Sequence, residues 1–291
     1  MMKILVTGSN GQLGSELKFL QSEFPHFQFK FFDRKSWDIT SGSETERRVA
    51  QEKPDVIVNC AAYTAVDKAE EEPQVAAKVN DEAVKHLADA AQRHDCFLIH
   101  FSTDYVFDGK SKKAYQPSDA TNPLSVYGKT KLQGEKHVLK IDKGLVLRVS
   151  WLFSTFGNNF LKTMLRLGQE RDELSVVNDQ IASPTYARTL ANDLLAVLQR
   201  WEKGELKPYG LFHYSHEGLA SWFDFAGEIF RTEDIPVDLK PVTSEEFKTA
   251  AERPHFSKLD SSGWKNETGI NPINWEESVK FCLKNLKKEN E

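Results

Sequence analysis

Short apolar runs alternate with amphipathic stretches over the first 150 residues of the chain. The apolar runs, rich in Ile, Val, Leu and Phe, predict buried strands at 3–7, 27–32, 56–60, 97–101 and 144–149. The amphipathic stretches between them predict helices at 13–20, 43–52, 73–94 and 126–139. Strands that alternate with helices are typical of βαβ units, so we expect a parallel sheet covered on both faces, with right-handed crossovers.

The pattern changes after about Trp151. Helical periodicity returns at 160–170, 189–201 and 221–230, a strand is expected at 210–215, and 176–185 mixes apolar and polar residues. Ser221 is a plausible N-cap for the third of these helices. We therefore predict an α/β protein in which a Rossmann-type, doubly wound parallel sheet occupies residues 1–150. A smaller C-terminal α+β lobe, residues 151–291, would bind substrate, and the helix near 189–201 could return to the first domain.

A glycine-rich turn follows the first predicted strand and opens the first predicted helix. Its sequence is GSNGQLG, with glycines at 8, 11 and 14. Such glycines permit a tight turn and let the backbone approach a pyrophosphate, while the helix N-terminus supplies N–H donors. The turn therefore predicts a dinucleotide site formed by Gly8, Asn10, Gly11, Gln12, Leu13 and Gly14.

Two charged residues end the second predicted strand, about 20 residues beyond the glycines. Asp33 at this position favours NADH, because a carboxylate can accept a hydrogen bond from the adenosine ribose. Arg34 favours NADPH, because a guanidinium can pair with a 2′-phosphate. Both residue types are present, so the cofactor is predicted as NADPH or NADH, with Asp38 and Ile39 near the adenine ring.

A Tyr-x-x-x-Lys motif, Tyr127 and Lys131, lies on a predicted helix. Positions i and i+4 share one helix face, so the phenol and the ammonium would lie side by side. A free tyrosine has a pKa near 10, and we expect the neighbouring cation to lower it so that Tyr127 can serve as an acid. Lys131 can also hold the nicotinamide ribose, so Tyr127 and Lys131 are expected to bind the cofactor as well. Thr103, at the end of the fourth strand, is the expected hydrogen-bond donor to a substrate carbonyl, ahead of Ser102.

Composition narrows the class of partner. The 38 Lys and Arg residues against 43 Asp and Glu residues give a net charge of −5, which argues against nucleic acid. Three separated cysteines without a CxxC pair fit a reducing compartment. No apolar stretch approaches the length of a membrane span, and the N-terminal apolar run is too short for a signal peptide. We therefore expect a cytoplasmic protein with no membrane partner.

Several longer motifs carry a specific resemblance. They include AAYTAVDKAE at 61–70, STDYVFDG at 102–109, YGKTK at 127–131 and LRVSW at 147–151. Further along come DQ at 179–180, SPT at 183–185 and RP at 253–254. In this order the motifs resemble the dTDP-4-dehydrorhamnose reductase family of extended short-chain dehydrogenases, from Lys3 to about Trp275.

The resemblance implies roles for residues that the spacing alone leaves unassigned. Cofactor-lining residues after the third strand would be Ala61, Ala62 and Tyr63. Residues near a nucleotide-sugar substrate would be Thr64, Val66, Thr103, Asp104, Tyr105, Trp151, Ser183, Thr185 and Arg253. The guanidinium of Arg253, with the hydroxyls of Ser183 and Thr185, would serve the nucleotide and its pyrophosphate.

The reaction implied is reduction of the C4 keto group of dTDP-4-dehydro-L-rhamnose, with Tyr127, Lys131 and Thr103 as the catalytic groups. Two alternatives remain at this stage: a nucleotide-sugar epimerase or dehydratase of the same superfamily, and a non-catalytic subunit like the regulatory subunit of methionine adenosyltransferase. Some relatives form magnesium-bridged dimers. Glu16 and Asp193 could contribute to such a site, but the nearby Asn192 and Arg188 make a dense acidic site less convincing, so we predict no metal and a homodimer as one option.

Overall fold

The computed structural model describes residues 1–290, with side chains through Lys288. Its centre is a parallel six-stranded sheet in the order β10-β5-β4-β3-β1-β2. The strands are β1 (Met2–Thr7), β2 (Phe27–Phe32), β3 (Val56–Asn59), β4 (Phe97–Thr103), β5 (Gly144–Val149) and β10 (Gly210–Tyr214). The predicted fold class, a Rossmann-type parallel sheet with flanking helices, is confirmed.

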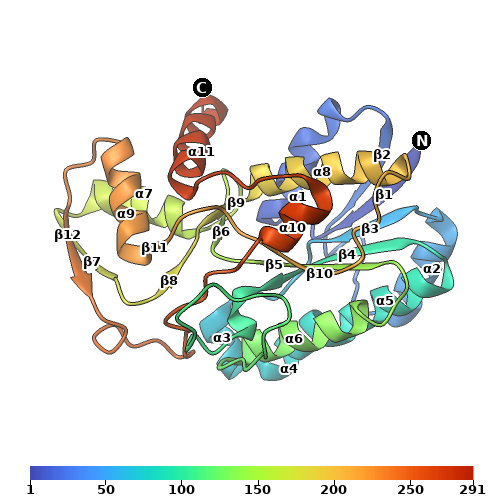
Figure 1. Cartoon of the computed structure of the whole chain (residues 1–291), viewed down its shortest axis with the longest axis horizontal. Helices are drawn as coiled ribbons and strands as arrows, with labels where there is room; N and C mark the ends of the chain where they lie inside the picture. The colour runs from blue at the N-terminus through green and yellow to red at the C-terminus, as the bar shows by residue number, and fades with distance from the viewer. Residues whose placement is uncertain (291) are drawn as a thin grey trace.

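Helices cover both faces of the sheet (Figure 1). One face, which carries Ile4, Val58 and Ile99, packs against helices α1 (Gln12–Leu20), α8 (Ala187–Glu202) and α10 (Ser262–Thr268). The opposite face, which carries Leu5 and Ile57, packs against α2 (Gly42–Glu52), α5 (Ala83–Arg93) and α6 (Val126–Val138). Alternate residues of each strand point to opposite faces, so continuous apolar strands supply both cores.

The helix predicted at 73–94 is interrupted. It consists of α4 (Pro73–Ala77), a five-residue π-helical turn η2 (Lys78–Glu82) and α5. Asn80 lies in this turn, and its amide bonds both backbone groups of Tyr63, accepting from the N–H at 2.9 Å and donating to the carbonyl at 3.0 Å. The turn therefore fixes the segment between β3 and the short helix α3 (Val66–Glu71).

The C-terminal lobe is built from short strand pairs and three helices (Figure 1). β6 (Leu152–Phe153) pairs with β9 (Thr185–Tyr186), β7 (Glu173–Val177) with β12 (Asp238–Val242), and β8 (Ile181–Ala182) with β11 (Ala220–Ser221). The helices are α7 (Phe160–Glu170), α9 (Trp222–Thr232) and α11 (Trp275–Asn290). Ser221 caps α9 as predicted, in a capping box with Asp224.

A single boundary at residue 150 proves too simple. The chain leaves the sheet after β5, but α8, β10 and α10 return to it, and β10 forms its edge by pairing with β5. The reason lies in the apolar face of α8, whose Leu190, Leu194 and Leu198 are fully buried in the core beneath β1. Among the described residues, no helix is long and apolar enough to cross a bilayer.

Candidate active site

The glycine turn joins β1 to α1 beneath a cavity of about 430 Å³. Gly8 has φ +64°, and a Cβ there would lie 2.5 Å from the backbone nitrogen of Ala61. Glycine is therefore required both for the left-handed backbone and for the close approach of β3. The first N–H groups of α1 have no partner within the helix, so this end can receive an anion.

Most of the predicted cofactor residues line this cavity: Gly8, Asn10, Gly11, Asp33, Arg34, Asp38, Ile39, Ala61, Ala62 and Tyr63. Gln12, Leu13 and Gly14 are not among the lining residues. Leu13 and Gly14 are buried on α1, and Gln12 bonds Asn159 of the lobe at 3.1 Å. Sequence reasoning missed Thr7, Trp37 and Val79, which also line the cavity.

Asp33 and Arg34 lie together at this cavity. The Asp33 carboxylate accepts hydrogen bonds from the Ser36 hydroxyl at 2.8 Å and from the Asn10 amide at 3.2 Å. These bonds, the Ser36 hydroxyl first, hold the pKa of Asp33 below its ordinary value. The cavity therefore presents a fixed carboxylate beside the exposed Arg34 guanidinium.

The predicted catalytic side chains meet at the carboxyl end of β4. Thr103 ends the strand and caps a short 3₁₀ turn, η3 (Asp104–Val106), by accepting from the Tyr105 N–H at 3.1 Å. Tyr127 lies in the first turn of α6, edge-to-face with Tyr105 at 5.9 Å between ring centroids. A Cβ on Gly128 would overlap the Tyr105 carbonyl oxygen, so glycine lets α6 begin directly against η3.

Tyr127 and Lys131 do not titrate as the sequence suggested. Burial raises the pKa of Tyr127 to about 12, although the Thr103 hydroxyl acts in the opposite direction. Burial lowers the pKa of Lys131 to about 8. The Lys131 Nζ donates to the Phe101 carbonyl at 2.6 Å, and no influence of Lys131 on the pKa of Tyr127 is found. The expected depression of the Tyr127 pKa is therefore not produced by the protein alone.

Asp104, predicted to contact substrate, is 2% exposed. Its carboxyl accepts from the Ser257 hydroxyl at 2.5 Å and from the Thr103 hydroxyl at 3.1 Å. Burial raises its pKa to about 7. Asp104 thus ties the end of β4 to Ser257 in the C-terminal segment. The neighbouring Tyr105 is only partly buried, so its side chain can still be reached from solvent.

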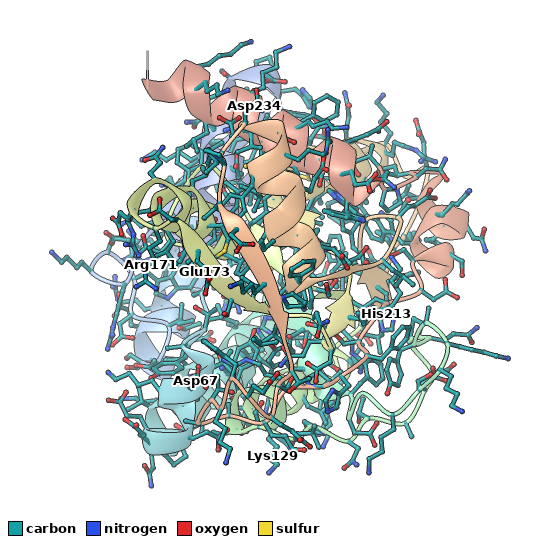
Figure 2. The ribbon with its side chains drawn as sticks, turned by 90° about the vertical axis from the view of Figure 1, so that its left-hand side faces the viewer. Asp67, Lys129, Arg171, Glu173, His213 and Asp234 are labelled. Carbon is teal, nitrogen blue, oxygen red and sulfur yellow. The ribbon has the colours of Figure 1, made fainter. Side chains whose placement is uncertain are left out.

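A second cavity, of about 650 Å³, lies in the lobe between α7, β7 and the segment before Arg253. It is mainly apolar, with Phe160, Met164 and Val176 in its wall, and Arg253 and Gln180 supply polar groups. Figure 2 looks at this end of the molecule and shows Arg171 and Glu173, two more lining residues, beside β7. The size and lining suit a small organic ligand.

Trp222 forms one wall of this cavity and stacks on Trp151, with ring centroids 3.6 Å apart and planes 8° from parallel. Trp151 adopts φ +47°, which is unusual for a residue with a side chain. The stack holds this backbone in place just after β5, at the same carboxyl edge of the sheet as Thr103, whose partner in register is Val149. Strain of this kind is concentrated at functional sites.

Arg253 lies at the edge of the same cavity but pairs with Asp67 of α3. Val66 begins that helix, and Thr64 is exposed just before it. Ser183 and Thr185 are fully buried and line neither cavity. The Ser183 hydroxyl oxygen lies 2.8 Å from the carbonyl oxygens of both His216 and Gly218, so protein groups surround it in this structure, and the nucleotide contact expected for Ser183 and Thr185 stays a prediction.

The acidic residues weighed for a metal are held by protein groups. Glu16 accepts from Arg188 and from the Ser154 hydroxyl, each at 2.6 Å. Asp193 accepts from the Tyr214 hydroxyl at 2.7 Å, and burial raises its pKa to about 6. Within residues 1–290, no group of three or more His, Cys, Asp or Glu side chains is arranged to hold a metal ion.

One buried ion pair behind the site was missed by sequence reasoning. Arg148 of β5 donates to both oxygens of Glu135 on α6, at 2.9 and 2.7 Å, and Ser102 donates to the same carboxylate at 2.5 Å. Arg148 and Glu135 are 3% and 1% exposed. The pair locks α6, which carries Tyr127, to β5, and the Ser102 hydroxyl ties the same carboxylate to β4, which carries Thr103. The sequence signalled it only through Arg148, a charged residue in an otherwise apolar strand.

The sheet order, the glycine turn and the Tyr127–Lys131 helix together define a Rossmann-type protein of the short-chain dehydrogenase/reductase class. Residues 2–288 match the family described as the RmlD substrate binding domain. The chain is 40% identical to the dTDP-4-dehydrorhamnose reductases of Aggregatibacter actinomycetemcomitans and Escherichia coli, over 96% and 98% of its length and 98% of each relative. The chain belongs to the dTDP-4-dehydrorhamnose reductase family.

Solved structures agree. The dTDP-4-dehydrorhamnose reductase of Clostridium acetobutylicum is 42% identical, with a TM-score of 0.92, over 98% of this chain and all of that one. The Bacillus anthracis enzyme, solved in complex with NADP, is 38% identical with a TM-score of 0.90 over the same shares. A dTDP-glucose 4,6-dehydratase of Streptomyces venezuelae, 15% identical with a TM-score of 0.80, shares the fold alone.

Proposed function

We propose that the protein reduces the C4 keto group of dTDP-4-dehydro-L-rhamnose to the hydroxyl of dTDP-L-rhamnose, with NADPH or NADH as the reductant. The observation that carries this proposal is the meeting of Thr103, Tyr127 and Lys131 at the carboxyl end of β4. In an open parallel sheet this is the edge at which ligands bind and react. The family relationship supplies the substrate and the direction of the reaction.

The residues around the first cavity fit a dinucleotide. Gly8 and Gly11, with the start of α1, suit the pyrophosphate, and Asp33 or Arg34 suits the adenosine ribose. Asp38 and Ile39 would flank the adenine, and the segment 61–63 would lie along the cofactor. Reduced nicotinamide supplies a hydride when bound.

The remaining chemistry falls to the chain's own side chains. The high pKa of Tyr127 keeps its phenol protonated near neutral pH, so the hydroxyl is available to protonate the carbonyl oxygen of the sugar. Thr103 would turn its hydroxyl from Asp104 to the same oxygen. An ammonium on Lys131 would stabilise the phenolate left on Tyr127.

The second cavity suits the nucleotide part of the substrate. Its apolar wall, which includes Trp222, offers a surface on which a base can stack. The Arg253 guanidinium can bind a diphosphate through two N–H groups. The sugar would then lie between Trp151 and Tyr105, with Thr64 and Val66 nearby. Cys60 and Cys96 form no disulfide, which supports a reducing compartment that we take to be the cytoplasm, and a homodimer is compatible with this reading.

The test is turnover with dTDP-4-dehydro-L-rhamnose, run in parallel with NADPH and with NADH. A reductase consumes one reduced dinucleotide for each keto sugar, so the nicotinamide absorbance falls in proportion to product. An epimerase or dehydratase leaves that absorbance unchanged. Absence of consumption with both dinucleotides, in a folded protein that binds them, would overturn the proposal.

A further inference from the structure

Three buried polar side chains form a row across the apolar sheet. Thr7, Asn59 and His100 are neighbours in register on β1, β3 and β4. Each is at most 1% exposed. Residues in register on adjacent parallel strands project to the same face, so the row lies on the side covered by α6. At its end, His100 lies beside Lys131 of that helix, with Nε2 3.3 Å from Nζ.

The hydrogen-bond partners fix the orientation of Asn59. Its Oδ1 accepts from the Ala61 backbone N–H at 3.2 Å and from the Thr7 hydroxyl at 2.6 Å. A backbone N–H can only donate, so the oxygen must lie on that side. The amide nitrogen therefore faces His100 Nδ1 at 3.0 Å, and this ring nitrogen must accept.

The tautomer of His100 follows. Burial holds the pKa of His100 well below its ordinary value, so the ring is neutral. A neutral imidazole whose Nδ1 accepts carries its proton on Nε2. The Nε2–H thus points at the Lys131 Nζ. An ammonium has no lone pair to receive it, whereas a neutral amine does.

We propose that His100 is a positioning residue that favours the neutral amine form of Lys131 in the free protein, so that binding of a dinucleotide under alkaline conditions is coupled to proton uptake by Lys131. This inference rests on the proposed function and on the cofactor-binding role expected for Lys131, whose Nζ would meet the hydroxyls of the nicotinamide ribose. Those hydroxyls accept hydrogen bonds from an ammonium, so the bound state favours the protonated form. The proton comes from solvent and converts the Nζ amine to an ammonium.

The other groups that act on Lys131 do not replace His100 in this role. Glu135, one turn along α6, raises the pKa of Lys131, but its charge is matched by Arg148. Cys60, after β3, also raises it, yet burial raises the pKa of the thiol and keeps it neutral. Burial acts in the same direction as His100 and lowers the pKa of Lys131 to about 8. An experiment must therefore separate burial from the His100 N–H.

The experiment is calorimetric titration of NADPH into the protein at pH 8.5, in buffers of different ionisation enthalpy. The slope of the binding enthalpy against the buffer enthalpy gives the number of protons taken up. With a pKa of about 8 for Lys131 in the free protein, about three-quarters of the amine is unprotonated at this pH. We expect the wild type to take up about half to three-quarters of a proton, and its affinity to weaken as the pH rises above about 8.

His100→Leu removes the Nε2–H while Lys131 stays buried. Uptake should fall to less than half of the wild-type value, because more of Lys131 is already protonated before binding. His100→Gln places an amide N–H where Nε2 lies and should keep uptake near the wild-type value. His94→Gln, a substitution at a histidine that pairs with Glu46 away from both cavities, is the matched control and should also keep it.

Each outcome decides something. Equal uptake by His100→Leu and the wild type would assign the effect to burial and overturn the role of His100. Binding by the wild type without proton uptake would overturn the coupling and leave the proposed function intact. No binding of either dinucleotide would overturn both. If His100→Leu does not fold, loss of uptake in a folded His100→Gln, as judged by thermal unfolding, would contradict the donor role.

Discussion

The Arg253 guanidinium and the Asp67 carboxylate form a two-pronged ion pair, with Nη2 2.6 Å from Oδ2 and Nη1 3.1 Å from Oδ1. The pair joins the lobe to helix α3 at the edge of the 650 Å³ cavity. It holds the guanidinium in a fixed plane and also occupies the N–H groups that a diphosphate would use. We therefore expect an anionic substrate to compete with Asp67 for the Arg253 guanidinium.

The first prediction concerns this exchange. Arg253→Ala should raise the KM for the nucleotide sugar by about 10–100-fold, the loss expected for hydrogen bonds to a charged group, with a smaller change in kcat. Asp67→Asn keeps the hydrogen-bonding shape but removes the competing charge, so its KM should fall or stay unchanged. Steady-state kinetics check both variants. A rise in KM for Asp67→Asn equal to that of Arg253→Ala would show that the pair acts only as a structural tie.

The second prediction concerns the proton donor. Tyr127→Phe should lower kcat by roughly 10²–10⁴-fold, the range for loss of a general acid, with dinucleotide affinity retained. Tyr209→Phe is the control, because the Tyr209 hydroxyl bonds Trp201 beside α8 and its ring packs on Phe97. Near-native turnover by a folded Tyr127→Phe would remove Tyr127 from the mechanism.

The third prediction concerns Arg34, the exposed cation beside Asp33. If it pairs with a 2′-phosphate, Arg34→Ala should raise the KM for NADPH by about 5–50-fold and leave the KM for NADH unchanged. Initial rates with the two dinucleotides measure the difference. Equal changes in the KM for NADPH and for NADH would mean that Arg34 does not bind the 2′-phosphate.

The fourth prediction concerns the pH dependence of stability. Burial raises the pKa of Asp104 to about 7, from its ordinary value of 3.8. Between these values the folded protein keeps a proton that the unfolded chain releases, so this group's contribution to stability falls as the pH rises from about 4 to 7. The free energy of unfolding of Asp104→Asn, measured relative to that of the wild type, should therefore increase by roughly 2–4 kcal/mol between pH 4 and pH 7. Urea unfolding at pH 4, 5.5 and 7 measures it, and a constant difference would contradict the shifted pKa.

The fifth prediction concerns the buried pair of Glu135 and Arg148. Glu135→Ala leaves the guanidinium buried without its partner and should lower the free energy of unfolding by ~3–5 kcal/mol. The double variant Glu135→Leu with Arg148→Met removes both charges and should recover most of that loss. Chemical denaturation of the single and double variants tests this. A double variant no more stable than Glu135→Ala would assign the loss to packing.

Local patterns predicted much of this protein. Five strands of the sheet were visible as apolar runs because buried parallel strands need apolar residues on both faces. The sixth, β10, was predicted as a strand but assigned to the lobe. The glycine turn and Tyr127–Lys131 were visible because their spacing is short. What the sequence could not predict depends on register between distant segments. Asn59 meets His100 only because β3 and β4 pair in that register, and Arg253 meets Asp67 across 186 residues.

The pKa values of the buried site residues could not be predicted from the sequence either. A neighbouring lysine lowers the pKa of a tyrosine only if its charge faces the phenol, and here Lys131 is turned toward the Phe101 carbonyl. Likewise, the hydroxyls of Ser183 and Thr185 were expected at the ligand because of the motif that carries them. Thr185 is buried where β9 pairs with β6, and Ser183 is buried against the carbonyls of His216 and Gly218; no local pattern encodes either contact.

Because β10 and α8 return to the sheet, the chain cannot be divided into two independent fragments at the end of β5. A fragment that stops after β5 would leave the edge of β5 unpaired and would lack helix α8, whose leucines pack against the sheet. Such a fragment would aggregate, and the lobe could not be exchanged as a single cassette. Grafting a different sugar specificity onto this scaffold therefore calls for replacing the segments around 151–186 and 215–258 together, with the helix and edge strand between them left in place.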